Sequence, residues 1–257
     1  MSDKAIEGGI KLNPINKGIY SSAVSVIIAT YNAGETLQRC LDSIYKQKFQ
    51  DVEIIIMDGR STDDTVDILI QNSSKIYYWR SEKDDGIYYA LNKALDYITG
   101  NWVIFLGADD ELLPGFSDMV KELIEPSSIY YGSVLYKEDK CGGYISPYKM
   151  AKIGMQHQAM FYSASIFKKY KYDPKYSISA DSVLNMTCRG DKSIKFIFKD
   201  YIVSRFNHTG ISARQTDALL KKNMSRLVLK HFGFVIWVRY MVRIFKKRFL
   251  NRKLIIY

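Results

Sequence analysis

The chain has 257 residues, of which 47% are hydrophobic and 14% aromatic, and its formal net charge is +10. This length and apolar content suit one large domain or two halves that share a core, and they exclude a disordered chain. No run of about 18 apolar residues predicts a membrane-spanning helix, and residues 1–17 lack the apolar segment of a signal peptide. The three cysteines are widely spaced and predict neither a disulfide framework nor a zinc site. We therefore expect a cytosolic protein, whose charge leaves nucleic acid, an anionic membrane or an anionic substrate open as partners.

Strand and helix patterns alternate through residues 22–125, after a polar segment, 1–21, that predicts a loose leader. Short β-branched runs predict buried strands at 24–29, 52–57, 76–79 and 102–106. Apolar residues at helical spacing predict helices at 35–48 and 86–98. Between them, Thr62 is expected as the cap of a helix that carries Val66, Ile68, Leu69 and Ile70. This alternation predicts an α/β fold with a doubly wound, mostly parallel sheet. Ligands of such sheets bind beyond the carboxyl ends of the strands.

The pattern changes after Pro126. Mixed-polarity strands are predicted at 129–136 and 195–206, with a helix near 182–188 between them. Residues 126–212 are therefore interpreted as an α+β half of the same domain, packed on the first half. Residues 213–257 are predicted to form a helical, basic tail.

Several acidic residues follow predicted strands, and the topology places them on one rim with Tyr31. Asp109 and Asp110 come directly after the strand at 102–106, and adjacent carboxylates suit Mg²⁺ or Mn²⁺. An acidic turn is the equally weighted alternative. Asp58 begins a turn, DGRSTDDT, in which its carboxylate either closes the turn or accepts hydrogen bonds from a base or ribose. The sequence has neither a GxGxxG fingerprint nor a P-loop.

Motifs in a fixed order carry a resemblance to the inverting family 2 glycosyltransferases of the GT-A fold. They are VSVIIATYN at 24–32, DGRSTDDT at 58–65, SEKDDGIYYALNK at 81–93 and FLGADDELLP at 105–114. HQAMFY at 157–162 and SAD at 179–181 resemble the bacterial O-antigen, capsule and exopolysaccharide enzymes of that family. The resemblance spans residues 24–213, with one departure. Tyr89 stands where those enzymes usually have an acidic residue, in the motif GIYDA.

The resemblance implies a role for each matching position. A nucleotide diphosphate sugar, most simply a UDP-sugar, would be bound by Thr30, Tyr31, Asn32, Asp58, Asp84, Asp109 and His157. Asp110 and His208 would bind Mn²⁺ or Mg²⁺, and Asp181 would be the catalytic base. The implied acceptor is a polyprenyl-diphosphate-linked saccharide, so the enzyme would work on the inner face of the bacterial plasma membrane. Without the resemblance, His157 would be interpreted as a core or turn histidine.

General chemistry agrees with these implied roles. A divalent cation stabilises the charge that develops on a leaving diphosphate. A carboxylate that takes the proton of the acceptor hydroxyl as it attacks contributes about 10²–10⁴-fold to the rate. A single base opposite the leaving group would give one displacement with inversion.

The positive charge is concentrated at the C-terminus. Residues 221–257 hold 11 of the 37 Lys and Arg residues and no acidic residue, so residues 1–220, with 26 basic and 27 acidic residues, have a net charge of −1. A helical wheel places basic residues on one side (Arg239, Arg243, Lys246, Lys247) and apolar residues on the other (Phe234, Trp237, Val238, Met241, Ile244, Phe245). Such a helix is typical of an anionic membrane interface. The alternative is a terminal helix that packs on the domain or in a homodimer.

Two other classes of protein remain as alternatives at this point. A nucleic-acid-binding protein would carry basic residues across a binding face, whereas here they crowd one terminus. A nucleotidyltransferase would share the sheet and the acidic pair, but would need a Gly-rich, basic phosphate loop after the first strand. Residues 30–35 (TYNAGE) provide no such loop.

Overall fold

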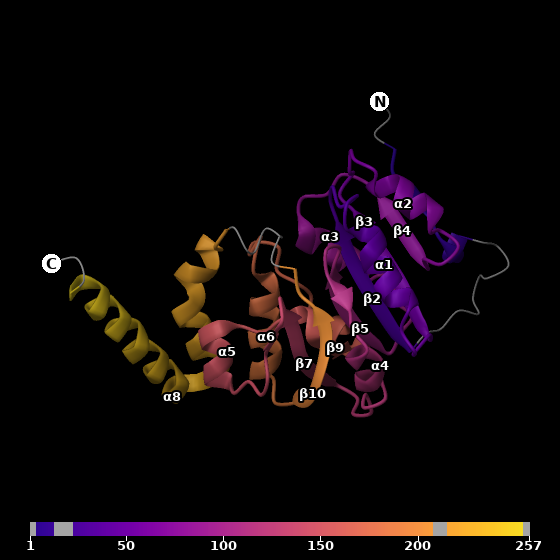
Figure 1. Cartoon of the computed structure of the whole chain (residues 1–257). Coiled ribbons are helices and arrows are strands. Elements are labelled where there is room, and N and C mark those ends of the chain that lie inside the picture. The colour runs from indigo at the N-terminus through magenta and orange to yellow at the C-terminus, as the bar shows by residue number, and fades with distance from the viewer. Residues whose placement is uncertain (1–3, 13–22, 208–214, 254–257) are drawn as a thin grey trace.

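The centre of the molecule is a long, mostly parallel sheet with helices on both faces, and a bent C-terminal helix extends from one end (Figure 1). The computed structural model describes residues 4–12, 23–207 and 215–253. The strands are β1 (Ile6–Gly8), β2 (Val24–Thr30), β3 (Val52–Asp58), β4 (Tyr78–Ser81), β5 (Trp102–Gly107), β6 (Glu111–Leu112), β7 (Ser128–Tyr136), β8 (Asp139–Cys141), β9 (Met160–Ser163) and β10 (Lys195–Arg205). The helices are α1 (Leu37–Tyr45), α2 (Thr65–Gln71), α3 (Ile87–Ala94), α4 (Gly115–Val120), α5 (Pro147–Ile153), α6 (Ala180–Gly190) and α8 (Ala218–Lys253), with short 3₁₀ turns η1 (Ile10–Leu12), η3 (His157–Ala159) and η4 (Ala164–Lys168).

The strands lie in the order β1-β4-β3-β2-β5-β9-β7-β10-β6, and β8 pairs with β7. The pairs β2–β3, β2–β5, β3–β4 and β7–β10 are parallel, as the strand-helix alternation predicts. The antiparallel strand β9 joins the two halves, because it pairs with β5 on one side and with β7 on the other. The sheet is therefore continuous from the first half of the chain to the second.

Each face of the sheet carries its own apolar core. In β2, Ile27 belongs to the core under α3 and α6, whereas Ile28 belongs to the core under α1, α2 and α4. Both side chains are completely buried. This burial on both faces explains why the strand has a continuous apolar sequence instead of an alternating one.

The structure corrects several expected boundaries. The first helix is shorter than 35–48, the third is shorter than 86–98, and the third strand begins at Tyr78. The expected cap at Thr62 is wrong, since the second helix begins at Thr65 with Asp64 at its N-cap position. The backbone N–H of Thr62 instead donates to Asn32 Oδ1 at 2.9 Å, so this turn is hydrogen-bonded to the loop that follows β2.

The segment expected to be a loose leader is also partly structured. Residues 6–8 form β1, which pairs antiparallel with β4, and η1 follows directly. Glu7 anchors the strand, because its carboxylate accepts a hydrogen bond from the Tyr78 hydroxyl at 2.6 Å. The N-terminal segment thus adds a strand to one edge of the sheet.

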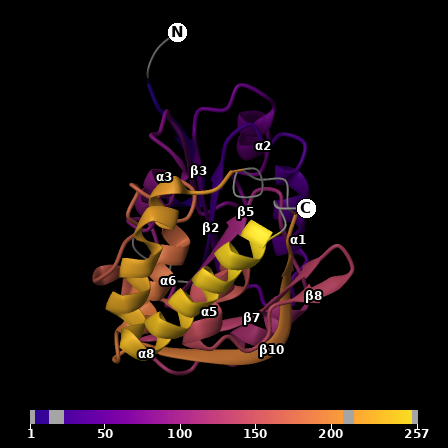
Figure 2. The same cartoon turned by 90° about the vertical axis from the view of Figure 1, so that its left-hand side faces the viewer.

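The helix α8 consists of two arms joined at a kink. Gly233 has φ 80° and ψ 174°, a conformation that interrupts the helix and that favours glycine. The first arm lies beside α6, and the second runs past α5 and away from the body (Figures 1 and 2). Across the described parts of the chain, no helix has both the length and the apolar content needed to cross a membrane.

Candidate active site

The carboxyl ends of β2 and β3 form a polar rim that the chain holds by hydrogen bonds between loops. Asn32 has φ 50°, and its backbone N–H donates to Ser61 Oγ at 2.8 Å. Thr30 ends β2, and its buried hydroxyl has no hydrogen-bond partner among the residues that the structure describes. A buried hydroxyl at a strand end can serve a ligand, because an unmade hydrogen bond there is costly.

Tyr31, Gly59 and Asp84 lie together beside this rim. The Tyr31 side chain is 65% exposed. A Cβ atom at Gly59 would lie 3.1 Å from Asp84 Oδ2 and 3.4 Å from Tyr31 Cδ2. The side chains of Asp84 and Tyr31 therefore both lie close to the Gly59 backbone. Asp84 is oriented by the backbone N–H of Gly86, which donates to Oδ1 at 2.9 Å. An exposed ring beside a fixed carboxylate can stack on a base and accept hydrogen bonds from it.

Asp58 is nearly inaccessible to solvent and organises the rim. Its Oδ2 accepts hydrogen bonds from the Ser61 backbone at 2.9 Å and from Ser81 Oγ at 2.6 Å, and its Oδ1 accepts one from Ser61 Oγ. Only 2% of the residue is exposed. Asp58 therefore fixes the loops that follow β3 and β4.

Asp109 and Asp110 come together over Gly107, at the carboxyl end of β5. A Cβ atom at Gly107 would lie 2.7 Å from Asp110 Oδ2 and 2.9 Å from Asp109 Oδ1, so the approach requires glycine. The backbone N–H of Asn207 donates to Asp110 Oδ1 at 2.8 Å, and its side chain donates to the Asp109 carbonyl at 2.8 Å. Asn207 thereby ties the end of the second half of the sheet to the acidic pair.

The acidic pair has the chemistry of a site for a hard cation. Burial, with the nearby charge of Asp109, raises the pKa of Asp110 to about 6. A divalent cation would compensate two such carboxylates, and oxygen donors are what Mg²⁺ and Mn²⁺ prefer. Within the described ranges, no three His, Cys, Asp or Glu side chains are grouped closely enough to hold a metal ion by themselves. The other predicted ligand, His208, lies outside the described residues.

Asp181 lies in the first turn of α6, and both of its carboxylate oxygens have protein partners. The Tyr88 hydroxyl lies 2.9 Å from Oδ1 and also 2.9 Å from the Ile178 carbonyl oxygen. His157 Nδ1 lies 3.4 Å from Oδ2. Burial acts to raise the pKa of Asp181, but the contacts with His157 and Tyr88 outweigh it and lower that pKa below its ordinary value. The carboxylate is thus held ionised and oriented.

His157 connects the carboxylate of Asp181 to the acidic pair electrostatically. Burial acts to lower the pKa of His157, but the hydrogen bond to Asp181 and the charges of Asp181 and Asp110 raise it overall. The histidine begins η3, whose following residue, Gln158, accepts a hydrogen bond from Ser204 through its carbonyl at 2.8 Å. The geometry therefore places His157 at the site and not in an apolar core.

The described predicted residues thus form three groups: the rim with Tyr31 and Asp84, the acidic pair, and Asp181 with His157. Sequence reasoning missed Tyr88 and Asn207. Tyr88 stands within the GIYYA motif, and nothing in the sequence distinguishes this buried tyrosine from its exposed neighbour Tyr89. The only signal for Asn207 is its position next to His208.

Comparison with known proteins identifies the class. The family model described as Glycosyl transferase family 2 matches residues 25–187. A PGL/p-HBAD biosynthesis glycosyltransferase of Mycobacterium bovis is 32% identical over 198 residues, which cover 72% of this chain and 77% of that protein. The chain belongs to glycosyl transferase family 2, and the nucleotidyltransferase and nucleic-acid-binding alternatives are set aside.

Other relatives differ in how much of the chain they match. A GalNAc(5)-diNAcBac-PP-undecaprenol beta-1,3-glucosyltransferase of Campylobacter jejuni is 34% identical over 129 residues, or 45% of this chain and 39% of that protein. Among solved structures, S. aureus TarS 1–349 in complex with UDP-GlcNAc has a TM-score of 0.67 at 17% identity, covering 87% of this chain and 73% of that one. The same fragment in complex with UDP has a TM-score of 0.62 at 18% identity, and the match spans 80% of this chain but only 64% of the TarS chain. These likenesses establish the GT-A fold.

Proposed function

We propose that this protein is an inverting glycosyltransferase that moves a hexose from a nucleotide diphosphate sugar, most simply a UDP-sugar, to a polyprenyl-diphosphate-linked saccharide of a bacterial surface polysaccharide. The observation that carries this proposal is the Asp181 carboxylate, which Tyr88 and His157 hold ionised, with His157 also within electrostatic reach of Asp110. A single oriented carboxylate suits one in-line displacement.

In the proposed reaction, Asp181 takes the proton of the acceptor hydroxyl as its oxygen bonds to the anomeric carbon. The bond between that carbon and the diphosphate oxygen breaks, and the nucleoside diphosphate leaves with the electron pair. Attack from the face opposite the leaving group inverts the anomeric centre, so an α-linked donor gives a β-linked product. Tyr31, Asn32 and Asp84 would hold the nucleoside, with Thr30 below it, and the buried Asp58 would act by fixing the loops that carry them.

The proposed cation is Mn²⁺ or Mg²⁺, held by Asp110 with His208 and placed next to Asp109. When bound it would supply a Lewis acid for the charge of the leaving diphosphate. The convergence of the two carboxylates over Gly107 supports this assignment. The mannosyltransferase of Pyrobaculum calidifontis, solved in complex with GDP-Man and Mn²⁺, has a TM-score of 0.59 to this chain at 18% identity. A lipid-linked acceptor would also make the enzyme peripheral to the inner face of the plasma membrane.

Substitution of the proposed base and of the proposed metal ligand tests the assignments separately. Asp181→Asn keeps the shape of the side chain and should lower kcat by at least about 10²-fold, while calorimetry still detects the donor. Asp110→Ala should abolish Mn²⁺-dependent donor binding. The readout is product formed from a panel of nucleotide sugars and a synthetic lipid-diphosphate saccharide.

Asp96→Asn serves as the matched control, since Asp96 forms an exposed ion pair with Lys171. It should retain wild-type turnover. Near-wild-type turnover of Asp181→Asn would refute the base assignment, and unchanged donor binding by Asp110→Ala would refute the metal assignment.

A further inference from the structure

The second arm of α8 presents an uncovered apolar stripe to solvent. We define the outer stripe as the large apolar side chains of this arm that are at least 37% exposed: Phe234, Val235, Val238, Met241, Val242 and Phe245. Their spacing follows the helical repeat, so they form one continuous face. Phe234 and Phe245, at its two ends, are 67% and 75% exposed. An exposed, contiguous apolar face of this kind is typical of an interaction site.

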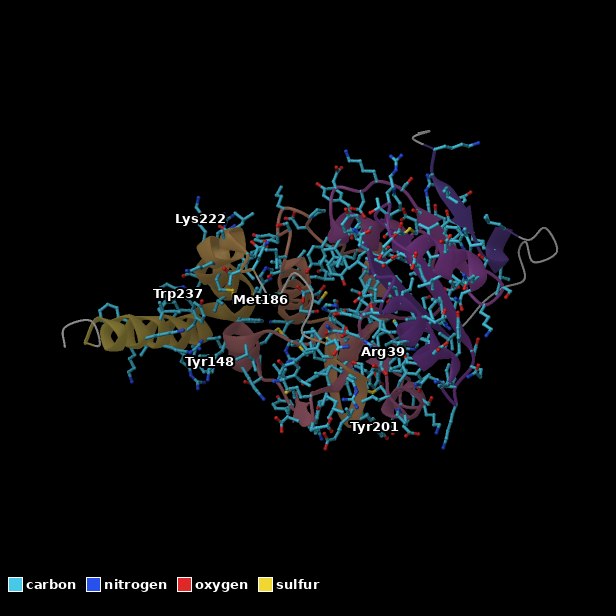
Figure 3. The ribbon with its side chains drawn as sticks, turned by 45° about the horizontal axis from the view of Figure 1, so that its top comes forward. Arg39, Tyr148, Met186, Tyr201, Lys222 and Trp237 are labelled. Atoms are coloured by element: carbon cyan, nitrogen blue, oxygen red, sulfur yellow. The ribbon has the colours of Figure 1, made fainter. Side chains whose placement is uncertain are left out.

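The opposite side of the arm is attached to the body, which refines the two-sided wheel expected from the sequence. Trp237 donates from Nε1 to Ser225 Oγ of the first arm at 2.9 Å. The Arg239 guanidinium lies 4.5 Å from the centroid of the Tyr148 ring on α5. Figure 3 labels Trp237 and Tyr148 where the second arm meets the body. Part of the apolar side is therefore covered by the protein, whereas the outer stripe is left uncovered.

Basic side chains border the outer stripe along one side. On the helix, Lys246 and Arg239 lie about 20° and 40° beyond the edge of the stripe at Val235, and Arg243 and Lys247 lie about 80° and 120° beyond it. None of the residues 221–257 is acidic. An apolar face with a purely cationic border is complementary to a bilayer surface, where apolar side chains enter the acyl boundary and cations meet anionic headgroups.

From this arrangement we propose that the second arm of α8 docks on an anionic lipid bilayer through the outer stripe and its basic border. Gly233 turns the second arm away from the first, so that this arm extends beyond the body (Figure 1). The arm lies in the interface and does not cross it. This inference rests on the surface of the arm and does not require the proposed reaction.

A second copy of the chain is a less suitable occupant of the same face. A two-fold symmetric contact brings identical surfaces together. Two copies joined through the outer stripe would bring their basic borders close to each other, with no acidic residue in either tail to offset the repulsion.

Vesicle sedimentation of the full-length protein tests the proposal. Phosphatidylcholine vesicles with about a third of phosphatidylglycerol should bind the protein, and pure phosphatidylcholine vesicles should bind it at least about tenfold more weakly. Lys246→Gln with Lys247→Gln should weaken binding to the anionic vesicles by about 10- to 30-fold. Phe234→Ser with Phe245→Ser should weaken it at least about tenfold, because both rings are exposed and removable without a cavity.

Matched controls alter the same residue types elsewhere on the surface. Ile124→Ser changes a side chain that is 78% exposed, and Lys48→Gln with Lys83→Gln removes two exposed charges. Both should bind vesicles like the wild type. Equal binding to neutral and anionic vesicles, or unchanged binding of the stripe and border variants, would overturn the proposal. So would a dimer in sedimentation equilibrium that only the stripe variant dissociates.

Transfer to a short water-soluble acceptor distinguishes the two proposals. Stripe and border variants should retain it, since none of the altered residues contacts the active site. Lost vesicle binding with retained transfer would support the arm proposal whatever the natural acceptor is.

Discussion

Tyr88 gives the proposed base a direction as well as a charge. Its hydroxyl lies 2.9 Å from both Asp181 Oδ1 and the Ile178 carbonyl, while the ring is 94% buried and packs against Tyr172. Burial and the charge of Asp181 raise the pKa of Tyr88, so the hydroxyl stays protonated and can only donate to the carboxylate. A base that is ionised but free to rotate would spend less time facing the acceptor.

We predict that Tyr88→Phe lowers kcat by about 10- to 100-fold, because a hydrogen bond to a charged group is worth about 1.5–3 kcal/mol. The KM for the nucleotide sugar should stay within about twofold, since the donor site is formed by other residues. Steady-state kinetics with varied donor separates the two constants.

The adjacent tyrosine supplies the control for this experiment. Tyr89 is 49% exposed, so Tyr89→Phe removes the same hydroxyl without touching Asp181. Its kcat should equal that of the wild type. A loss in KM instead of kcat for Tyr88→Phe would show that this residue serves binding and not the base.

At the scale of elements, Glu53 holds three segments together from within β3. Its carboxylate accepts hydrogen bonds from Ser25 Oγ of β2 at 2.5 Å and from the backbone N–H groups of Thr99 and Gly100 at 2.6 and 3.1 Å. Only 1% of the residue is exposed. The loop that precedes β5 is thus fixed to the amino ends of β2 and β3, opposite the active-site rim.

Glu53→Leu should lower the free energy of unfolding by about 2–5 kcal/mol, because it removes the carboxylate that accepts hydrogen bonds from Ser25, Thr99 and Gly100 in a buried site. Urea denaturation monitored by circular dichroism measures the change. Glu138→Ala is the control, since that side chain is 92% exposed and its loss should cost under about 0.5 kcal/mol. Equal stability of Glu53→Leu and the wild type would contradict the role of this carboxylate.

The sequence correctly predicts the strands that can be recognised from the apolar residues of one segment alone. The buried runs that form β2, β3 and β5 are confirmed because both of their faces are covered. The pattern does not predict β1, β6 or β8, which contain two or three residues each and exist only through pairing. Local sequence carries little information about such contacts.

The same distinction applies to the candidate site. Topology alone brings Asp58 and the acidic pair to one rim, and the structure places them at the ends of β3 and β5. The contact between Tyr88 and Asp181 joins residues that are 93 positions apart, and no motif spacing in the sequence predicts it. Likewise, the participation of Asn207 depends on how β10 runs beside β7.

At the scale of the molecule, the continuous sheet makes the two halves a single unit. Ile27 and Ile28 are neighbours that are buried in different cores, one on each face. We predict that Ile27→Ala and Ile28→Ala each cost about 2–5 kcal/mol, because each removes a buried side chain and leaves a cavity.

Both variants should unfold in one transition in which tryptophan fluorescence and circular dichroism coincide. Two of the three tryptophans, Trp79 and Trp102, belong to the core that contains Ile28, so fluorescence reports on that core when Trp237 on α8 is replaced by Phe in every variant. If the two cores unfolded independently, Ile27→Ala would shift the circular dichroism transition and leave the fluorescence transition in place. Coincident shifts would show that the two cores, each of which contains residues from both halves of the chain, unfold as one cooperative domain.

The pairing of β1 with β4 has a consequence for how these molecules behave at high concentration. Without β1, the outer edge of β4 would present unpaired N–H and C=O groups, and such an edge is a template for strands of other molecules. A strand of three residues, fixed by the contact between Glu7 and Tyr78, occupies that edge. The opposite end of the sheet is closed by the two residues of β6. The sheet thus ends in a very short strand on each side, which leaves little edge for pairing with other molecules.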